Sequence, residues 1–247
     1  MKKTFLFAGL MLASGLPGGV AMSQFLLDLE TGRFYSGYND VAVPGKIGTR
    51  ISLSDELKAD PGIFFRVRLG FTIHGRHTVS TLIAPLRIHS SGLGDRPVFF
   101  EGVTFPTGTK LESRFRFDSY RLTYRYDFLR KPNWTAGAGI SAKIRDASIS
   151  LKGAGLFSEK KNTGFVPLIH FRVLGDLTRR LGLFLEGDAL GAPQGRAEDV
   201  LIAATFRPVH RVRLKLGYRI LEGGANVEEV YNFTLIHYAV AGMILEW

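Results

Sequence analysis

The 247-residue sequence predicts an all-β fold, a transmembrane antiparallel up-and-down β-barrel. Its last segment, residues 233–247, places apolar residues at alternate positions and finishes on the aromatic residue Trp247. A two-residue period indicates a strand, and an alternating strand at an aromatic carboxy terminus is typical of the closing strand of a bacterial outer-membrane barrel. Similar alternating segments recur along the chain, and cysteine is absent, so no disulfide framework can hold the fold.

The amino terminus has the pattern of a secretory signal peptide. Met1-Lys2-Lys3 is positively charged, about a dozen apolar residues follow, and small residues precede Gln24. The apolar stretch is too short for a membrane-spanning helix, which needs about 20 residues. We therefore expect a signal peptide at residues 1–23 and a single outer-membrane β-barrel domain at residues 24–247.

Ten segments show the two-residue period, and single-chain bacterial barrels have an even number of strands. Short connections alternate with longer ones, as periplasmic turns alternate with extracellular loops, so both termini are expected in the periplasm. An eight-stranded barrel, with one weak pair of segments folded as loop, is the alternative. The expected strands are residues 24–37, 61–73, 77–89, 111–128, 134–151, 164–176, 182–190, 198–208, 211–221 and 233–247. The expected long loops are residues 38–60, 90–110, 152–163, 191–197 and 222–232.

Alternation within the strands sorts the side chains onto two faces. Because lipid tolerates few charges, the charged face of each strand is expected to line the lumen. Ten strands leave little free space inside, so ion pairs should plug most of the lumen and leave at most a narrow path that prefers anions. The basic residues expected inside are Arg66, Arg68, Arg87, Arg114, Arg116, Arg121, Arg125, Lys143, Arg145, Arg172, Arg213, Lys215 and Arg219. The acidic residues expected inside are Asp28, Glu30, Asp118, Asp127, Glu186, Asp188 and Glu246.

Two expected strands change the phase of their apolar residues. Apolar residues occupy odd positions before residues 118–119 and even positions after them, and the reverse change occurs across residues 145–146. A β-bulge shifts the alternation by one residue, so we expect a bulge at each place. Such a bulge either corrects the curvature of the barrel near its outer rim or turns Arg145 and Asp146 toward a site.

The charge of the chain indicates its partners. The formal net charge is +10, or +8 without Lys2 and Lys3, which in a soluble protein would suggest nucleic acid. Here the basic residues are spread singly through alternating strands and do not form a patch with stacking aromatics, so nucleic-acid binding is not expected. The expected partners are outer-membrane lipid, the anionic lipopolysaccharide, and the barrel-assembly machinery through the closing strand. A monomer is expected.

Several strings of residues resemble an uncharacterised family of proteobacterial outer-membrane β-barrel proteins. They are Lys143-Ile-Arg-Asp-Ala147, Gly164-Phe-Val-Pro-Leu168, residues 188–199, and residues 217–225 together with Tyr231-Asn-Phe233. The resemblance runs through most of the mature chain and is strongest from about residue 110 onward. It implies a location and an architecture, without an activity. This chain ends in Trp247 where such relatives typically end in Phe.

Ionisable residues gather where the strands are expected to reach the outer end. Two loops, residues 193–199 and 222–229, combine turn-forming Gly and Asn with carboxylates and an Arg. Together with groups near strand ends, including His89, they are expected to form either one polar binding cluster or a self-paired, solvated loop surface. The candidate binding residues are Arg145, Asp146, Asp188, Arg196 and Glu222. No cofactor or metal site is predicted, because His74 and His77 have no further ligands nearby in the sequence.

The sequence leaves three function classes open. The first is a structural or interaction protein of the cell surface with a charged, largely plugged lumen. The second is a small anion-preferring channel. The third is a lipid A-modifying enzyme, a lipid-editing hydrolase that would use His237, which is expected on the lipid-facing side of the last strand and near Ser36 of the first. A lone histidine there is also a common interface anchor, so a non-enzymatic role is favoured. Protease chemistry through Asp188, His89 or Glu222 lacks a distinctive motif.

Overall fold

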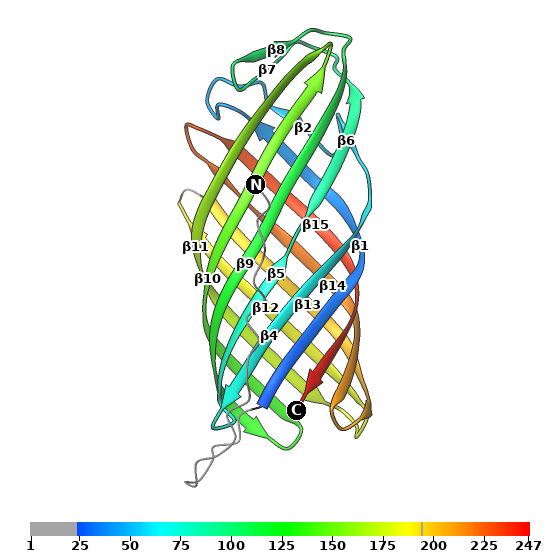
Figure 1. Cartoon of the computed structure of the whole chain (residues 1–247), viewed down its shortest axis with the longest axis vertical. Coiled ribbons are helices and arrows are strands. Elements are labelled where there is room, and N and C mark those ends of the chain that lie inside the picture. Colours follow the sequence, from blue (N-terminus) through cyan, green and yellow to red (C-terminus); the bar gives the residue numbers. More distant parts are fainter. Residues whose placement is uncertain (1–23, 194) are drawn as a thin grey trace, which may run out of the picture.

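Ten long strands form a closed antiparallel barrel in the computed structural model, which describes residues 24–193 and 195–247 (Figure 1). Each wall strand is hydrogen bonded to its neighbours along the chain, and β15 (Tyr231–Glu246) closes the wall against β1 (Gln24–Ala42). The predicted ten-stranded barrel is confirmed, and the eight-stranded alternative is wrong. The expected signal peptide lies outside the described residues.

The other wall strands follow chain order. β5 (His77–Ala84) and β6 (Arg87–Leu93) pair with β9 in one continuous register and together make a single wall strand. The interruption falls at Pro85, which has no N–H to donate to the ladder. The remaining wall strands are β4 (Gly62–Ile73), β9 (Lys110–Lys131), β10 (Trp134–Gly153), β11 (Leu156–Asp176), β12 (Leu181–Ala192), β13 (Gly195–Val209) and β14 (Val212–Asn226).

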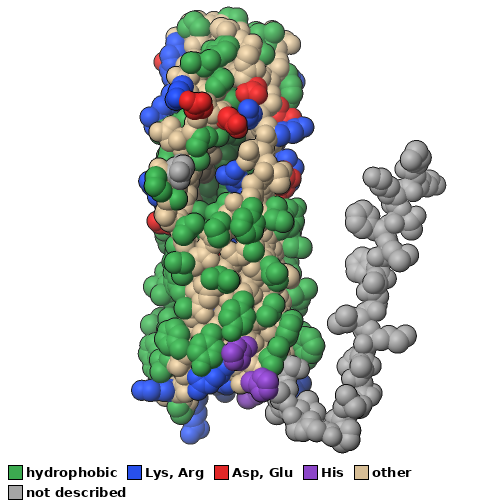
Figure 2. All heavy atoms as spheres, turned by 90° about the vertical axis from the view of Figure 1, so that its left-hand side faces the viewer, with side chains coloured by type: hydrophobic (Ala, Val, Ile, Leu, Met, Phe, Trp, Pro, Cys, Tyr) green, Lys and Arg blue, Asp and Glu red, His purple; other side chains and the backbone are tan. Residues whose placement is uncertain are grey.

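Exposed apolar side chains form a belt on the wall strands, and Figure 2 shows it crossing one face of the barrel. Its side chains are large, exposed and outward-facing, as with Leu122, Ile140 and Leu216, the last of which is 71% exposed. Within the described residues no helix is long and apolar enough to cross a membrane. A strand needs only about 9–11 residues to span a bilayer, whereas β9 has 22 residues. The strands therefore project well beyond the belt at one end of the barrel. We call this end, which is opposite the start of β1 and Trp247, the outer end.

The polarity of the barrel inverts above the belt. β9 and β10 keep one register across residues 118–119 and 145–146, so both expected bulges are wrong. The inward-facing positions simply change from Arg121 and Lys143 at belt depth to buried Phe115 and Ile149 nearer the outer end. At this end of the barrel the outward-facing side chains are in water and the inward-facing side chains pack against apolar loops. The strands therefore keep their alternation, but polar residues now face outward and apolar residues face inward. The register shifts that do occur lie elsewhere, one of them in β1 between Ser36 and Tyr38.

Two loops cap the outer end with an apolar core. Residues 43–61 contain β2 (Ile51–Ser52), which pairs with β1, and β3 (Lys58–Ala59), which pairs with β6. Residues 94–109 contain the hairpin of β7 (Val98–Phe100) and β8 (Val103–Phe105), which lies at the top of Figure 1. The fully buried side chains of this cap include Leu53, Leu57, Phe100 and Phe105. They belong to the same apolar cluster as Phe115 and Ile149 of the wall.

The expected long loops are mostly wall strand. Residues 152–163 form a hairpin whose turn is Ala154-Gly155, both with positive φ, so this loop was wrongly predicted. Likewise β12 continues to Ala192, β13 already begins at Gly195, and β14 continues to Asn226. These stretches extend because their backbones pair with neighbouring strands. Their side chains do not alternate, since both faces near the outer end are partly exposed.

Candidate functional site

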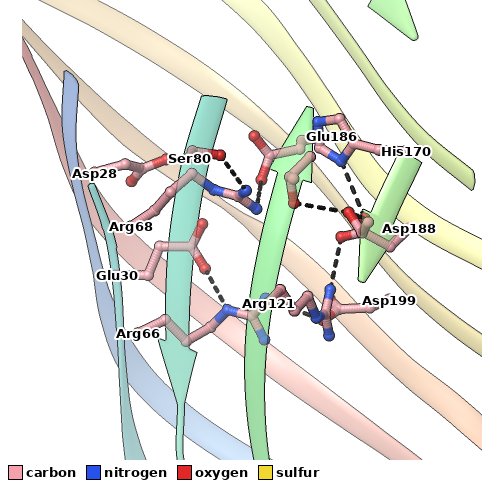
Figure 3. Close-up of polar contacts among 12 residues, drawn as sticks. Asp28, Glu30, Arg66, Arg68, Ser80, Arg121, His170, Glu186, Asp188 and Asp199 are labelled. Atoms are coloured by element: carbon pink, nitrogen blue, oxygen red, sulfur yellow. Dashed lines mark hydrogen bonds and ion pairs between the residues drawn. The ribbon is translucent and has the colours of Figure 1, made fainter. Parts of the chain in front are cut away.

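Asp199 lies at the centre of an ion-pair network that fills the lumen at belt depth (Figure 3). Its carboxylate accepts hydrogen bonds from Arg66 at 3.0 Å, from Arg121 at 2.5 Å and from Arg219 at 2.5 Å. All four side chains are less than 10% exposed. A buried charge without a partner is costly, so convergence of three strands' guanidinium groups on one carboxylate ties the walls together across the lumen.

Further carboxylates extend the network on both sides of Asp199. Glu30 accepts hydrogen bonds from Lys215 at 2.6 Å and Arg219 at 2.8 Å. Asp188 accepts from Arg121 at 2.6 Å and from the Ser141 hydroxyl at 2.5 Å, and its Oδ1 lies 3.1 Å from Nδ1 of His170. Further ion pairs join Asp28 to Lys215, Glu186 to Arg68 and Glu30 to Arg66.

The network leaves almost no free space. The cavity among Asp28, Glu30 and Arg68 and the cavity beside Tyr238 each have a volume of about 10 Å³. A water molecule needs at least about 10–15 Å³ of such volume. The lumen at this depth is therefore filled by side chains, as the sequence predicts for ten strands.

Three expected lumen cations are not in the lumen. Arg87, Arg114 and Arg116 belong to the outward-facing positions above the belt, because β6 and β9 keep their phase there. Arg87 pairs with Asp118, and Arg116 donates to Asp146 at 2.8 Å. At the opposite end, Glu246 is exposed and lines a vestibule of about 500 Å³ with Arg125, Arg172 and Arg213.

A pocket of about 460 Å³ lies in the outer half of the barrel, beyond the ion-pair network. Its inward-facing lining is mainly apolar and includes Phe115, Phe117, Ile149, Val166 and Leu221. Lys143 and Arg145 of β10 and Asn162 of β11 also line it. Pockets of 300–1,000 Å³ with mostly apolar walls and a few placed polar groups are typical of small-molecule sites.

The two cations of β10 in this pocket have no carboxylate partner. Lys143 is 2% exposed, forms no ion pair with a described carboxylate, and holds its Nζ 4.7 Å from the centroid of the Phe117 ring. Arg145 donates to the amide oxygen of Asn162, and its buried Nε has no hydrogen-bond partner among the described residues. Buried cations are costly without compensation, so Lys143 and Arg145 are the polar groups of this pocket that could take part in binding.

Arg196 and Glu222 line the same pocket, but unlike Lys143 and Arg145 they do not occupy inward-facing positions. Both occupy outward-facing positions of β13 and β14, and Arg196 donates to Glu222 at 2.7 and 2.8 Å. The Tyr38 hydroxyl also donates to Glu222. Burial alone would raise the pKa of Glu222, but the hydrogen bonds from Arg196 and Tyr38 hold that pKa below its ordinary value. This self-paired triad links β1, β13 and β14 in the wall of the pocket.

The structure brings together three of the five candidate binding residues. Arg145, Arg196 and Glu222 line one pocket, whereas Asp188 belongs to the lumen network and Asp146 pairs with Arg116 on the outer surface. His89 lies on the outer surface as well, beside a separate groove along β6 and β9.

The barrel closure does not assemble a hydrolytic pair. His237 faces outward, as the alternation predicts, and its Nδ1 is hydrogen bonded to the Tyr218 hydroxyl. Ser36 pairs with Ile236 in the ladder and belongs to the inward-facing positions, and its buried Oγ has no hydrogen-bond partner among the described residues. A serine nucleophile needs its base within hydrogen-bond reach, so these two residues do not supply that geometry.

Two important residues were missed as members of a site. Lys143 was expected only as one lumen cation among many, and no local pattern distinguishes a paired from an unpaired cation. Asp199 belongs both to the expected loop of residues 193–199 and to the expected strand of residues 198–208. It is absent from the acidic residues expected in the lumen, because the apolar residues 200–204 occupy both faces and give no polarity contrast. Within the described residues no group of three or more His, Cys, Asp or Glu is arranged to hold a metal ion.

Comparison with solved structures shows the fold. The outer membrane protease OmpT from Escherichia coli matches with a TM-score of 0.58 at 9% identity, over 91% of this chain and 97% of that chain. The fold is that of an outer-membrane β-barrel. The transport unit of the autotransporter AIDA-I from Escherichia coli matches with a TM-score of 0.41 at 8% identity, over 95% of this chain and 93% of the other. The attachment invasion locus protein Ail of Yersinia pestis matches with a TM-score of 0.39 at 10% identity, over 90% and 98%.

No protein-family model matches the sequence, and no curated protein matches it. At 9% identity the likeness to OmpT shows the barrel fold alone. The role of this barrel therefore has to be argued from its own pocket and lumen.

Proposed function

We propose that the protein is a non-conducting barrel of the bacterial outer membrane that binds an anionic ligand at its cell-surface end. The observation that carries the proposal is that Lys143 and Arg145, in a pocket that ends on a filled lumen, form no direct ion pair with a described carboxylate. An anionic group placed between them would receive charge-assisted hydrogen bonds, which are about twice as strong as neutral ones.

The proposed orientation places both termini in the periplasm and the cap outside. It is supported by the two long loops of the cap, residues 43–61 and 94–109, because all connections at the opposite end, beside the paired Phe25 and Trp247, are short. Short turns face the periplasm in bacterial barrels. The outward basic residues above the belt would then meet lipopolysaccharide, the closing strand β15 would be read by the barrel-assembly machinery, and the barrel would act as a monomer.

Binding is better supported than conduction or lipid hydrolysis. An anion path would have to pass Asp199 and its three guanidinium partners, where the residual cavities are about 10 Å³ each. Hydrolysis of lipid A would need a base close to a nucleophile, and His237 is hydrogen bonded to Tyr218 instead of Ser36.

The experiment combines conductance with anion binding. Purified protein in planar bilayers is expected to show no stepwise channel current, while the same protein binds inorganic phosphate measurably by calorimetry. K143M/R145M removes both pocket cations and is expected to lose that binding. The matched control R114M/K152M removes two outward-facing cations of β9 and β10 and should retain it. Stable unit currents, or equal phosphate binding by the two double variants, would overturn the proposal.

A further inference from the structure

The barrel wall is incomplete beside the pocket. β11 pairs with β12 only from Ile169, opposite Ala189, to Asp176. On its other side β11 pairs with β10 along its whole length, from Leu156 to Gly175. Among the described residues, 156–168 of β11 therefore have no strand partner on the side that faces the short β12–β13 hairpin.

Exposure along β11 shows that this gap is an opening. Its inward-facing residues are buried along the stretch that pairs with β12 and at the end of that stretch. Examples are His170, which is 1% exposed, and Leu168, which is 3% exposed. Farther up, Val166 is half-buried and Asn162 is exposed, although both belong to the inward-facing positions. Figure 2 shows the resulting hollow in the wall, lined by apolar side chains, just above the apolar belt. We call this opening between β11 and the β12–β13 hairpin the side window.

The height of the side window matches the border between lipid chains and head groups. Phe165, which lines the pocket at the window, is 67% exposed and pairs with Ile144, which is 51% exposed. Both point outward at the upper edge of the belt. The first charged side chains of the outer surface, such as Asp146, follow within two residues of Ile144. A molecule that lies in the outer leaflet would therefore meet the window at the level of its head group.

We infer that the pocket receives an anionic acyl amphiphile from the outer leaflet through the side window. The inference rests on the proposed anion binding at Lys143 and Arg145 and names its ligand class. The carboxylate or phosphate head lies at the two cations, and the acyl chain runs toward the outer end along Phe115, Phe117 and Ile149. The bound molecule is therefore inverted relative to its orientation in the leaflet. The cap closes the axial route from outside, and the ion-pair network closes it from the periplasm, so lateral access is the route that remains.

Strand addition from another chain fits the window less well. The open edge of β11 contains Pro167, which has no N–H, and two neighbouring lysines, Lys160 and Lys161. Proline and lysine on an edge strand oppose pairing with a further strand. The apolar pocket behind the edge also has no role in backbone pairing, whereas it accommodates an acyl chain directly.

The test uses the cysteine-free chain in nanodiscs of zwitterionic lipid. A solvatochromic fluorophore on A197C, an inward position lining the pocket, reports occupancy. Inorganic phosphate, octyl phosphate, dodecyl phosphate and dodecanoate are titrated separately. Each methylene that becomes buried contributes about 0.8 kcal/mol, so affinity is expected to rise about fourfold per methylene until the pocket is full. K143M/R145M should weaken dodecyl phosphate binding at least about tenfold.

A second pair of variants tests the route. A192W places a large side chain at the rim of the side window, and A204W places one on the lipid-facing side of β13 away from it. A192W is expected to slow association of dodecyl phosphate by about tenfold or more, while A204W leaves the rate unchanged. If the amphiphile enters from the leaflet, the association rate should follow its mole fraction in the membrane. If it enters from water, the rate should instead follow its free aqueous concentration.

The outcomes separate the two proposals. If phosphate binds but alkyl chain length does not raise affinity, or if A192W and A204W associate equally fast, the amphiphile and its route are wrong and the anion site stands. If neither phosphate nor any alkyl phosphate responds to K143M/R145M, the proposed anion site itself is wrong. A rate that follows only the free aqueous concentration would overturn access from the leaflet.

Discussion

The guanidinium of Arg66 lies 3.0 Å from the carboxylate of Asp199, although the two residues are 133 positions apart in the chain. Arg66 is on β4 and Asp199 on β13, strands on facing parts of the wall. The contact crosses the lumen and is one of three that converge on Asp199. The barrel is thus held by its backbone ladder around the circumference and by this network through its centre.

Replacing Asp199 is expected to destabilise the barrel strongly. D199N keeps the size of the side chain but leaves Arg66, Arg121 and Arg219 facing one another with one fewer carboxylate. Removal of one partner from a buried ion network costs about 3–5 kcal/mol. Equilibrium unfolding in urea, followed by tryptophan fluorescence of Trp134 and Trp247 in lipid vesicles, measures the loss. D95N, which removes an exposed carboxylate paired with Arg96, is the control and should change stability by less than about 1 kcal/mol. A loss for D199N no larger than that of D95N would mean that the network does not hold the walls.

The cap should loosen without loss of the barrel when its apolar core is truncated. F100A deletes a fully buried ring and is expected to cost the cap about 3–5 kcal/mol. The neighbouring Phe99 is only partly buried, so F99A should cost less. Proteinase treatment of intact cells measures the effect, because a loosened cap is cut within residues 94–109 while the wall strands stay protected. Equal resistance of F100A and wild type would contradict the packing, and cleavage only after the outer membrane is permeabilised would contradict the proposed orientation.

The sequence predicts the wall of the barrel better than its interior. Alternation depends on a contrast between two environments, and at belt depth that contrast is lipid outside against charge inside. The strand number, the closure of β15 on β1 and the inward positions of Arg66, Lys215 and Arg219 follow from it and are confirmed.

Above the belt the same rule fails, because the environments exchange polarity. Phe115 and Phe117 break phase with Leu122 only if the outward side of the wall is assumed to stay apolar along the whole strand. The structure keeps the phase and changes the environment. The pocket could not be predicted for a related reason: whether Lys143 has a carboxylate partner depends on which strands face it across the barrel, and strand spacing does not contain that information.

Acid should loosen the outer ends of β13 and β14. The pKa of Glu222 lies below its ordinary value of 4.5 because hydrogen bonds from Arg196 and Tyr38 outweigh the effect of burial, which alone would raise it. The ionised carboxylate therefore contributes stability above about pH 4.5, and that contribution is lost as the pH falls through the lowered pKa. Hydrogen exchange of residues 195–197 and 222–226, measured from pH 7 down to pH 3, follows this loss.

Two variants separate Glu222 from the other carboxylates of this region. R196A removes the main donor, so the onset of fast exchange should move to higher pH. E228Q neutralises an exposed carboxylate that pairs with Lys46 and should leave the profile of residues 195–197 unchanged. An unchanged onset in R196A would show that the triad does not set the acid response.

The border of the belt can be tested with one substitution on each side of it. Ile140 on β10 and Thr163 on β11 both face outward and are exposed, but Ile140 lies within the belt and Thr163 lies beyond its outer edge, above Phe165. An arginine at the bilayer midplane of a barrel costs about 2–4 kcal/mol, and near the interface the cost falls to about 0–1 kcal/mol. I140R should therefore destabilise the folded barrel in lipid vesicles by about 2–4 kcal/mol, whereas T163R should leave its stability nearly unchanged. Equal costs would move the membrane border away from Phe165, and the side window would then no longer lie at the level of the lipid head groups.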